Sequence, residues 1–70
     1  MENRNFDRNN AEKTFACGDE GDFYAFCRKC GLSAQMFEQS DGWQGVYTTT
    51  DSGVMVYYYG DEVMRFYGNN

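Results

Sequence analysis

The residues whose type and spacing best suit chemistry are the two cysteines of the CRKCG segment at residues 27–31. They have the C-x-x-C-G spacing of a zinc knuckle, and Cys17 could add a third thiolate, so the candidate zinc set is Cys17, Cys27 and Cys30. A closed structural site needs four ligands, and the chain has no histidine and no fourth cysteine, so Asp19 or Glu20 would have to complete it. The helical spacing instead favours Cys27 and Cys30 as small apolar residues on the buried side of a helix. We therefore expect no metal and no other cofactor.

Catalysis has little support in the available side chains. No histidine can serve as a general base, and no serine, threonine or cysteine has an evident activating partner. The acidic pair Asp61-Glu62 falls in a turn, where solvated charge is the default interpretation, and a 70-residue chain offers little room for a concave site. We expect a protein that is not an enzyme.

The charge balance favours a protein partner. Eleven acidic residues against six basic ones give a net charge of -5, which repels nucleic-acid phosphates and suits a partner with a basic surface. No apolar run approaches a membrane span, and the first residues do not begin a signal peptide. Three cysteines without a secretory signal predict reduced thiols, and so a cytoplasmic protein without membrane contact.

Residues 43–67 predict a three-stranded antiparallel β-meander, because Val, Thr and aromatic residues fill three runs that turn signals separate at residues 51–53 and 60–61. A two-residue loop at Gly60-Asp61 pairs Tyr57 with Met64. The first hairpin closes either over residues 50–53 or over residues 52–53. Both closures put Val46, Met55, Tyr57, Met64 and Phe66 on one face. The other face, called the second face below, carries Trp43, Tyr47, Val56, Tyr58, Val63, Arg65 and Tyr67.

The main helix is predicted over residues 22–30, because Phe23, Phe26, Cys27 and Cys30 recur at helical spacing and a glycine follows. A short second helix is predicted over residues 34–39. Residues 13–17 form either an extended lead-in or an edge strand that makes the sheet four-stranded. We expect residues 1–12 to be a mobile tail and residues 13–70 to form a single small α+β domain.

Residues 26–37, FCRKCGLSAQMF, resemble the turn region of a helix-turn-helix, and the hairpin that follows adds a resemblance to a winged-helix layout. This resemblance implies a nucleic-acid-associated regulator. The predicted recognition helix, however, has no Lys or Arg and contains Glu38, so the phosphate contacts that position such a helix are missing. Direct nucleic-acid binding is therefore disfavoured, and a zinc-stapled or winged-helix-like regulator is the alternative.

The second face is the surface that needs a partner, because both faces of the meander are apolar or aromatic and one helix covers only one of them. Trp, Tyr and Arg are enriched at binding hot spots. The alternatives are that the N-terminal segment or the short helix covers this face, or that a homodimer buries it. The candidate partner-binding residues form an aromatic set, Trp43, Tyr47, Tyr58, Arg65 and Tyr67, and an acidic set, Asp19, Glu20, Asp22, Asp51, Asp61 and Glu62.

Small size, acidity and the lack of catalytic and targeting signals resemble the broad class of small inhibitors made by phages and mobile elements. The resemblance implies stoichiometric binding to a host or defence protein, such as a CRISPR effector, a polymerase or a nuclease. In one version the acidic set mimics nucleic-acid charge and occupies a basic groove. In the other version the aromatic set makes the contact.

Overall fold

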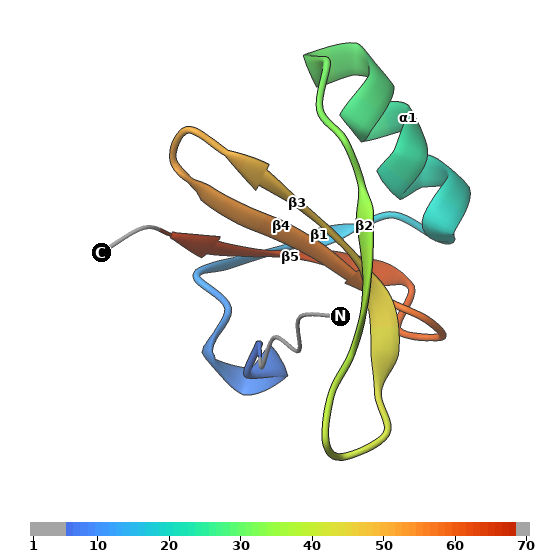
Figure 1. The fold of residues 1–70 in the computed structure, drawn as a ribbon, viewed down its shortest axis with the longest axis vertical. Helices are drawn as coiled ribbons and strands as arrows, with labels where there is room; N and C mark the ends of the chain where they lie inside the picture. Colours follow the sequence, from blue (N-terminus) through green and yellow to red (C-terminus); the bar gives the residue numbers. More distant parts are fainter. Residues whose placement is uncertain (1–5, 69–70) are drawn as a thin grey trace.

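The computed structural model describes residues 6–68, which form a five-stranded antiparallel sheet with one α-helix on one of its faces (Figure 1). The strand order is β1-β5-β4-β3-β2. The elements in chain order are a 3-10 turn η1 (Arg8–Asn10), β1 (Lys13–Ala16), α1 (Glu20–Cys30), β2 (Gln35–Glu38), β3 (Gln44–Thr50), β4 (Gly53–Tyr58) and β5 (Val63–Gly68).

The α+β class is confirmed, but the expected second helix over residues 34–39 is wrong, because this segment contains strand β2. Met36 lies opposite Val46 and Phe37 lies opposite Gly45 on the neighbouring strand β3. Two adjacent apolar residues fit a short helix as well as a strand that places one side chain on each face. So short a helix is unstable without tertiary support, and hydrogen bonding to β3 selects the strand.

Residues 13–17, expected as either an edge strand or an extended lead-in, contain edge strand β1. Lys13 lies opposite Phe66 and Ala16 lies opposite Val63 on β5. With β1 and β2 added at its two edges, the predicted meander becomes a sheet of five strands rather than three or four.

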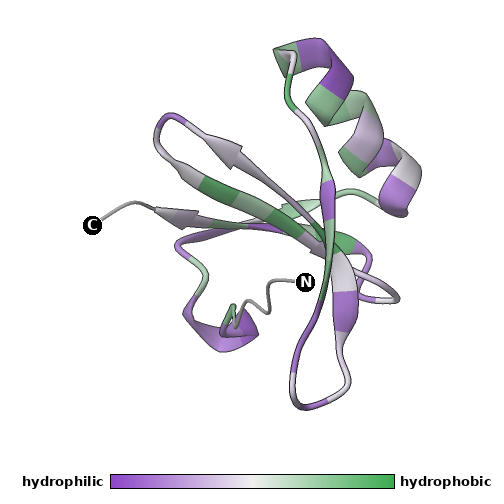
Figure 2. Cartoon of the chain, in the orientation of Figure 1, coloured by the Kyte–Doolittle hydropathy of each residue, from purple (hydrophilic) through white to green (hydrophobic). Residues whose placement is uncertain are grey.

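The register of the meander is the one that its turns predict. Tyr57 lies opposite Met64, and in the first hairpin Thr49 lies opposite Val54. The first hairpin thus follows the closure over residues 50–53, with Thr50 and Gly53 adding one further pair. Figure 2 shows the strongest hydrophobic colouring on β4, the central strand, and hydrophilic colouring at the turns.

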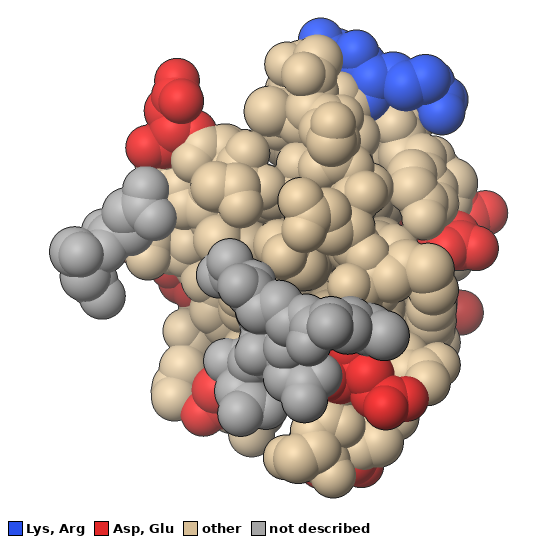
Figure 3. Space-filling view, viewed as in Figure 1, with Lys and Arg blue, Asp and Glu red and all other residues tan. Residues whose placement is uncertain are grey.

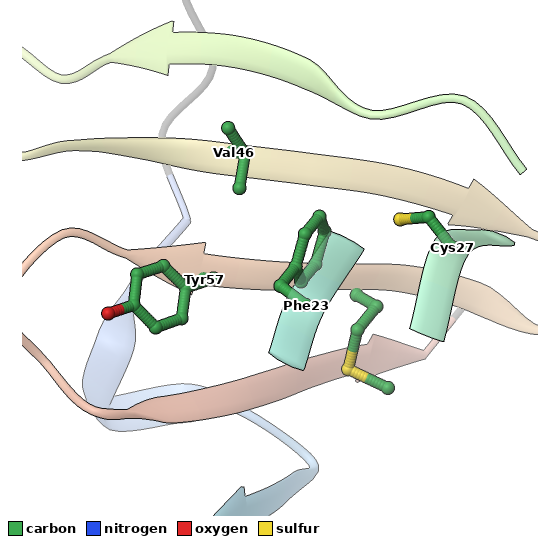
Figure 4. Close-up of a cluster of buried hydrophobic side chains, with 5 residues drawn as sticks. Phe23, Cys27, Val46 and Tyr57 are labelled. Carbon is green, nitrogen blue, oxygen red and sulfur yellow. The ribbon is translucent and has the colours of Figure 1, made fainter. Parts of the chain in front are cut away.

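Helix α1 packs on the predicted face and ends at the predicted glycine, Gly31. The Asp19 side chain accepts a hydrogen bond from the Asp22 N–H at 3.1 Å, so the helix begins at residue 20, earlier than predicted. Phe23 and Cys27 are buried against the sheet beside Val46 and Tyr57 (Figure 4). Cys30, expected on the same buried side, is exposed. It lies in the last turn, beside an open cavity that Met55 and Phe66 of the sheet also line.

Residues 6–12, expected as part of a mobile tail, lie against the sheet in the structure, and residues 1–5 of that tail lie outside the described residues. The Phe6 ring centroid is 5.5 Å from that of Phe37, 5.6 Å from that of Tyr47 and 5.3 Å from that of Tyr67. These aromatic partners lie on the second face. The sheet is therefore covered twice, by α1 on one face and by the N-terminal segment on the other.

At Gly45 the sheet leaves no room for a side chain, since a Cβ there would lie 2.1 Å from the Tyr57 carbonyl oxygen. We expect Gly45→Ala to lower the free energy of unfolding by about 1–3 kcal/mol, because β4 must move, and urea denaturation measures the loss. Gly21→Ala is the control. A Cβ there would meet only the Asp19 side chain, and alanine favours helix, so its effect should stay within about 1 kcal/mol. Equal losses in the two variants would contradict this account.

Candidate functional site

The aromatic set gathers on the second face, as the register predicts, but it lies beneath the N-terminal segment. Tyr47 is 5% exposed and Tyr58 is 0% exposed. The other three members are half-buried: Trp43, Arg65 and Tyr67. Tyr47 and Tyr58 belong to a second hydrophobic core together with Phe37 and Val56. In this arrangement the centre of the predicted contact surface is part of the protein interior.

The carbonyl group of Phe6 fastens the N-terminal segment to the sheet. The Tyr58 hydroxyl donates a hydrogen bond to it, and the Gln39 Nε2 donates a second one at 2.7 Å. Gln39 is 8% exposed and so places its amide in the interior with a partner, as buried polar groups require. Neither Phe6 nor Gln39 was a predicted site residue. The one signal for Phe6 is that it is a large apolar residue in an otherwise polar stretch.

Arg8 and Arg65 converge on Asp61 and hold the segment a second time. The Asp61 carboxylate is 3.4 Å from Arg8 Nη1 and 3.0 Å from Arg65 Nε, and Arg65 Nη1 donates to the Arg8 carbonyl at 3.1 Å. The Arg8 guanidinium also stacks on the Trp43 ring, 3.8 Å from its centroid, as a cation–π contact. Asp61 is therefore neutralised within the chain, and its side chain is only 15% exposed.

Four members of the acidic set come together where the loop before α1 meets the turn between β4 and β5. Asp19, Glu20 and Asp22 belong to the N-cap and first turn of α1, and Glu62 belongs to the turn between β4 and β5. The Glu62 carbonyl joins the two segments, because it accepts hydrogen bonds from the Cys17 and Gly18 N–H groups at 3.3 Å each. Within residues 6–68, no ion pair neutralises these carboxylates. We call this cluster the acidic end: Asp19, Glu20, Asp22 and Glu62.

Burial, reinforced by the acidic end, disfavours negative charge on the groups nearby. Burial raises the pKa of the Cys17 thiol above its ordinary value, and the charge of Asp22 raises it further. The pKa values of Tyr57 and Tyr59 are likewise raised, mainly by burial and to a smaller extent by nearby negative charge. A thiol held in its protonated form is a poor nucleophile and a poor metal ligand. The chemistry available here is therefore the attraction of positive charge.

The last acidic candidate and the basic residues of α1 lie away from the acidic end. Asp51, the last member of the acidic set, lies in the turn between β3 and β4, at the opposite end of β4 from the acidic end. Arg28 and Lys29 lie in the last turn of α1, and Figure 3 shows basic side chains gathered at that end of the molecule. The structure thus separates the predicted acidic set into three places: the acidic end, the ion pairs of Asp61, and the hairpin of Asp51.

The alternative zinc set is not brought together. Among residues 6–68 no group of three or more His, Cys, Asp or Glu side chains is arranged to hold a metal ion. Cys27 is buried in the core, where burial raises the pKa of its thiol, whereas Cys30 is exposed. The helix-turn-helix resemblance also fails, because the segment expected to be the recognition helix contains strand β2.

Comparisons of the chain with protein-family models, with curated proteins and with solved structures find no match. Across residues 6–68 no helix has the length and apolar character needed to cross a membrane. The functional argument therefore rests on the geometry and charge of the chain itself.

Asp61→Asn should lower the free energy of unfolding by about 1–2 kcal/mol, because it leaves two half-buried arginines without their carboxylate. Glu62→Gln is the matched control, since Glu62 makes no ion pair within residues 6–68, and it should change stability by less than about 0.5 kcal/mol. Urea denaturation measures both variants. The fluorescence of Trp43, the single tryptophan, reports whether Arg8 has left its ring. Equal effects of the two variants would mean that Asp61 does not hold the segment.

Burial raises the pKa of Tyr58 above the ordinary value of 10.0, and burial also raises the pKa of Tyr67. The folded state holds these protons more tightly than the unfolded chain. The corresponding stability is therefore fully present below about pH 10 and is lost as the pH rises further. At pH 7 we expect Tyr58→Phe to cost about 1 kcal/mol for the lost hydrogen bond. Urea unfolding at rising pH should narrow the gap between wild type and variant above about pH 10, and a gap independent of pH would contradict this assignment.

Proposed function

We propose that this protein acts by stoichiometric binding to a partner protein with a basic surface, and that the acidic end is the contact. The observation that supports this is the meeting of Asp19, Glu20 and Asp22 with Glu62 from a distant part of the chain, with no cation of residues 6–68 paired to them. Unpaired surface charge of one sign steers association with a partner of the opposite sign and contributes to its specificity.

The acidic end is a better candidate than the aromatic set, because a partner reaches it without any rearrangement. To reach Tyr47 and Tyr58, a partner would have to displace Phe6 from three aromatic rings and break the hydrogen bonds to its carbonyl. It would also have to separate Arg8 from Asp61. Preformed surfaces are the usual contacts in complexes whose backbones change little on binding.

Carboxylates gathered at one end of the molecule present a partner with negative charge, as a phosphate backbone does. A basic groove that binds nucleic acid is held largely by such charge, so it would also accept the acidic end. We therefore propose a binding inhibitor of a nucleic-acid-handling host or defence protein, such as a CRISPR effector, a polymerase or a nuclease. We also propose that this inhibitor acts by binding alone and is not an enzyme.

The test compares three forms of the protein as baits in a nuclease-treated host lysate, with captured proteins identified by mass spectrometry. The first is wild type, the second is Glu20→Lys with Glu62→Lys, and the third is Glu12→Lys with Asp51→Lys. The third bait is the control, because it makes the same change in net charge away from the acidic end and leaves the N-cap Asp19 in place. Circular dichroism checks that all three are folded.

The expected result is one stoichiometric protein that wild type and the control bait retain and that the acidic-end variant loses. With the purified partner, the acidic-end variant should bind at least about tenfold more weakly and with a flatter salt dependence. Failure of the wild-type bait to retain any stoichiometric protein from the nuclease-treated lysate would overturn protein binding as the function. Equal loss from the two charge-reversed baits would show that overall charge, rather than the acidic end, makes the contact.

A further inference from the structure

The outer side of strand β2 is open for hydrogen bonding. β2 forms one edge of the sheet and pairs with β3. Just after β2, the Gln39 N–H donates a hydrogen bond at 2.7 Å to the carbonyl of Trp43, the residue before β3. Hydrogen-bonded and non-hydrogen-bonded pairs alternate along an antiparallel ladder, so Phe37 bonds to β3 while Met36 and Glu38 direct their N–H and C=O groups outward. Within residues 6–68, no loop or turn supplies backbone hydrogen bonds to these outward groups.

β2 is also the less protected of the two sheet edges. Proteins shield edge strands with charged side chains, lysine above all, and with local bulges. β1 carries Lys13, and at its end the Cys17 and Gly18 N–H groups share one carbonyl, which breaks the regular ladder. β2 has no lysine, its one charged residue is Glu38 at its end, and Met36 lies within it with 69% of its surface exposed.

A shallow cavity of about 210 Å³ lies beside this edge and is lined by Met36, Phe37, Glu38 and Gln44. An open edge next to a side-chain cavity is the arrangement by which sheets accept an added strand. The backbone hydrogen bonds provide affinity, and the cavity selects the side chain. A flexible apolar side chain such as methionine suits a cavity of this kind.

We propose that β2 pairs with β2 of a second copy of this chain, antiparallel about a two-fold axis, so that the two sheets become continuous. The outward groups of Met36 and Glu38 must form the hydrogen-bonded pairs. Pairing Met36 with the second copy's Glu38 would set an apolar side chain against a carboxylate that already accepts a hydrogen bond from Gln44. The favoured register therefore places Met36 directly opposite Met36 of the second copy.

The charges at the two ends of β2 favour this antiparallel arrangement. The strand begins shortly after the last turn of α1, which carries Arg28 and Lys29, and it ends at Glu38, shortly before Asp41 (Figures 1 and 3). A two-fold axis through the strand brings Arg28 and Lys29 of one copy toward Glu38 and Asp41 of the other. The net charge of -5 on each copy and the short length of β2 oppose association. We therefore expect a weak dimer, with a Kd on the order of tens of micromolar.

Sedimentation equilibrium over a concentration series tests the dimer. The average mass of wild type should rise from 8.1 kDa toward twice that value. Met36→Lys should raise the Kd at least about tenfold, because it adds an edge lysine and removes the apolar contact. Phe15→Lys is the matched control, since Phe15 is an exposed apolar residue on the other edge, 42% exposed, and it should leave the Kd unchanged. A monomer at every concentration up to about 1 mM, or equal weakening by both variants, would overturn the proposal.

Disulfide cross-linking tests the register. In a Cys30→Ser background, which removes the exposed native cysteine, Met36→Cys should form an oxidised dimer. Opposite residues of a hydrogen-bonded pair have Cα atoms about 5.5 Å apart, within the range that a disulfide spans. Phe15→Cys in the same background should not cross-link at a comparable rate, and equal rates would overturn the pairing. The proposal is independent of the acidic end, so the Glu20→Lys, Glu62→Lys variant should still dimerise.

Discussion

A sheet that is apolar on both faces must be covered on both, and this requirement shapes the whole molecule. Helix α1 buries one face through Phe23 and Cys27. Residues 6–68 contain no second α-helix that could cover the other face. The N-terminal segment takes that role by inserting Phe6 among the aromatic side chains of the second face. A domain this small buries a modest share of its surface, so each covering contact is a large part of its stability.

Covering the second face also determines which charges remain for a partner. Arg8 and Arg65 are both used to hold the N-terminal segment, and they neutralise Asp61 between them. The remaining described cations, Lys13, Arg28 and Lys29, lie on β1 and at the far end of α1. Among residues 6–68 the acidic end is therefore left with uncompensated negative charge, and internal packing has separated the basic end of α1 from it.

Short strands at the sheet edges have a further consequence. A central strand such as β4 is paired on both sides, whereas β1 and β2 each leave one row of backbone groups without a neighbouring strand. In a larger protein a helix or loop often covers such an edge. Here the covering elements are already used on the two faces, so the protection of each edge depends on its own side chains, and β2 has no lysine.

Local patterns in the sequence determined the meander, its register and faces, and the glycine at the end of α1, because turn residues and alternating side chains act over a few neighbouring positions. Only the tertiary structure decided that Met36 and Phe37 belong to a strand and that Phe6 covers the second face. It likewise decided that Glu62 meets the first turn of α1. Each of these depends on contacts between distant parts of the chain, where the energy of packing and pairing outweighs local preference. The candidate site shows the same division. Residue types alone identified the aromatic and acidic sets, but contacts between distant segments decided that the N-terminal segment covers the aromatic set and that Glu62 joins the acidic residues of α1.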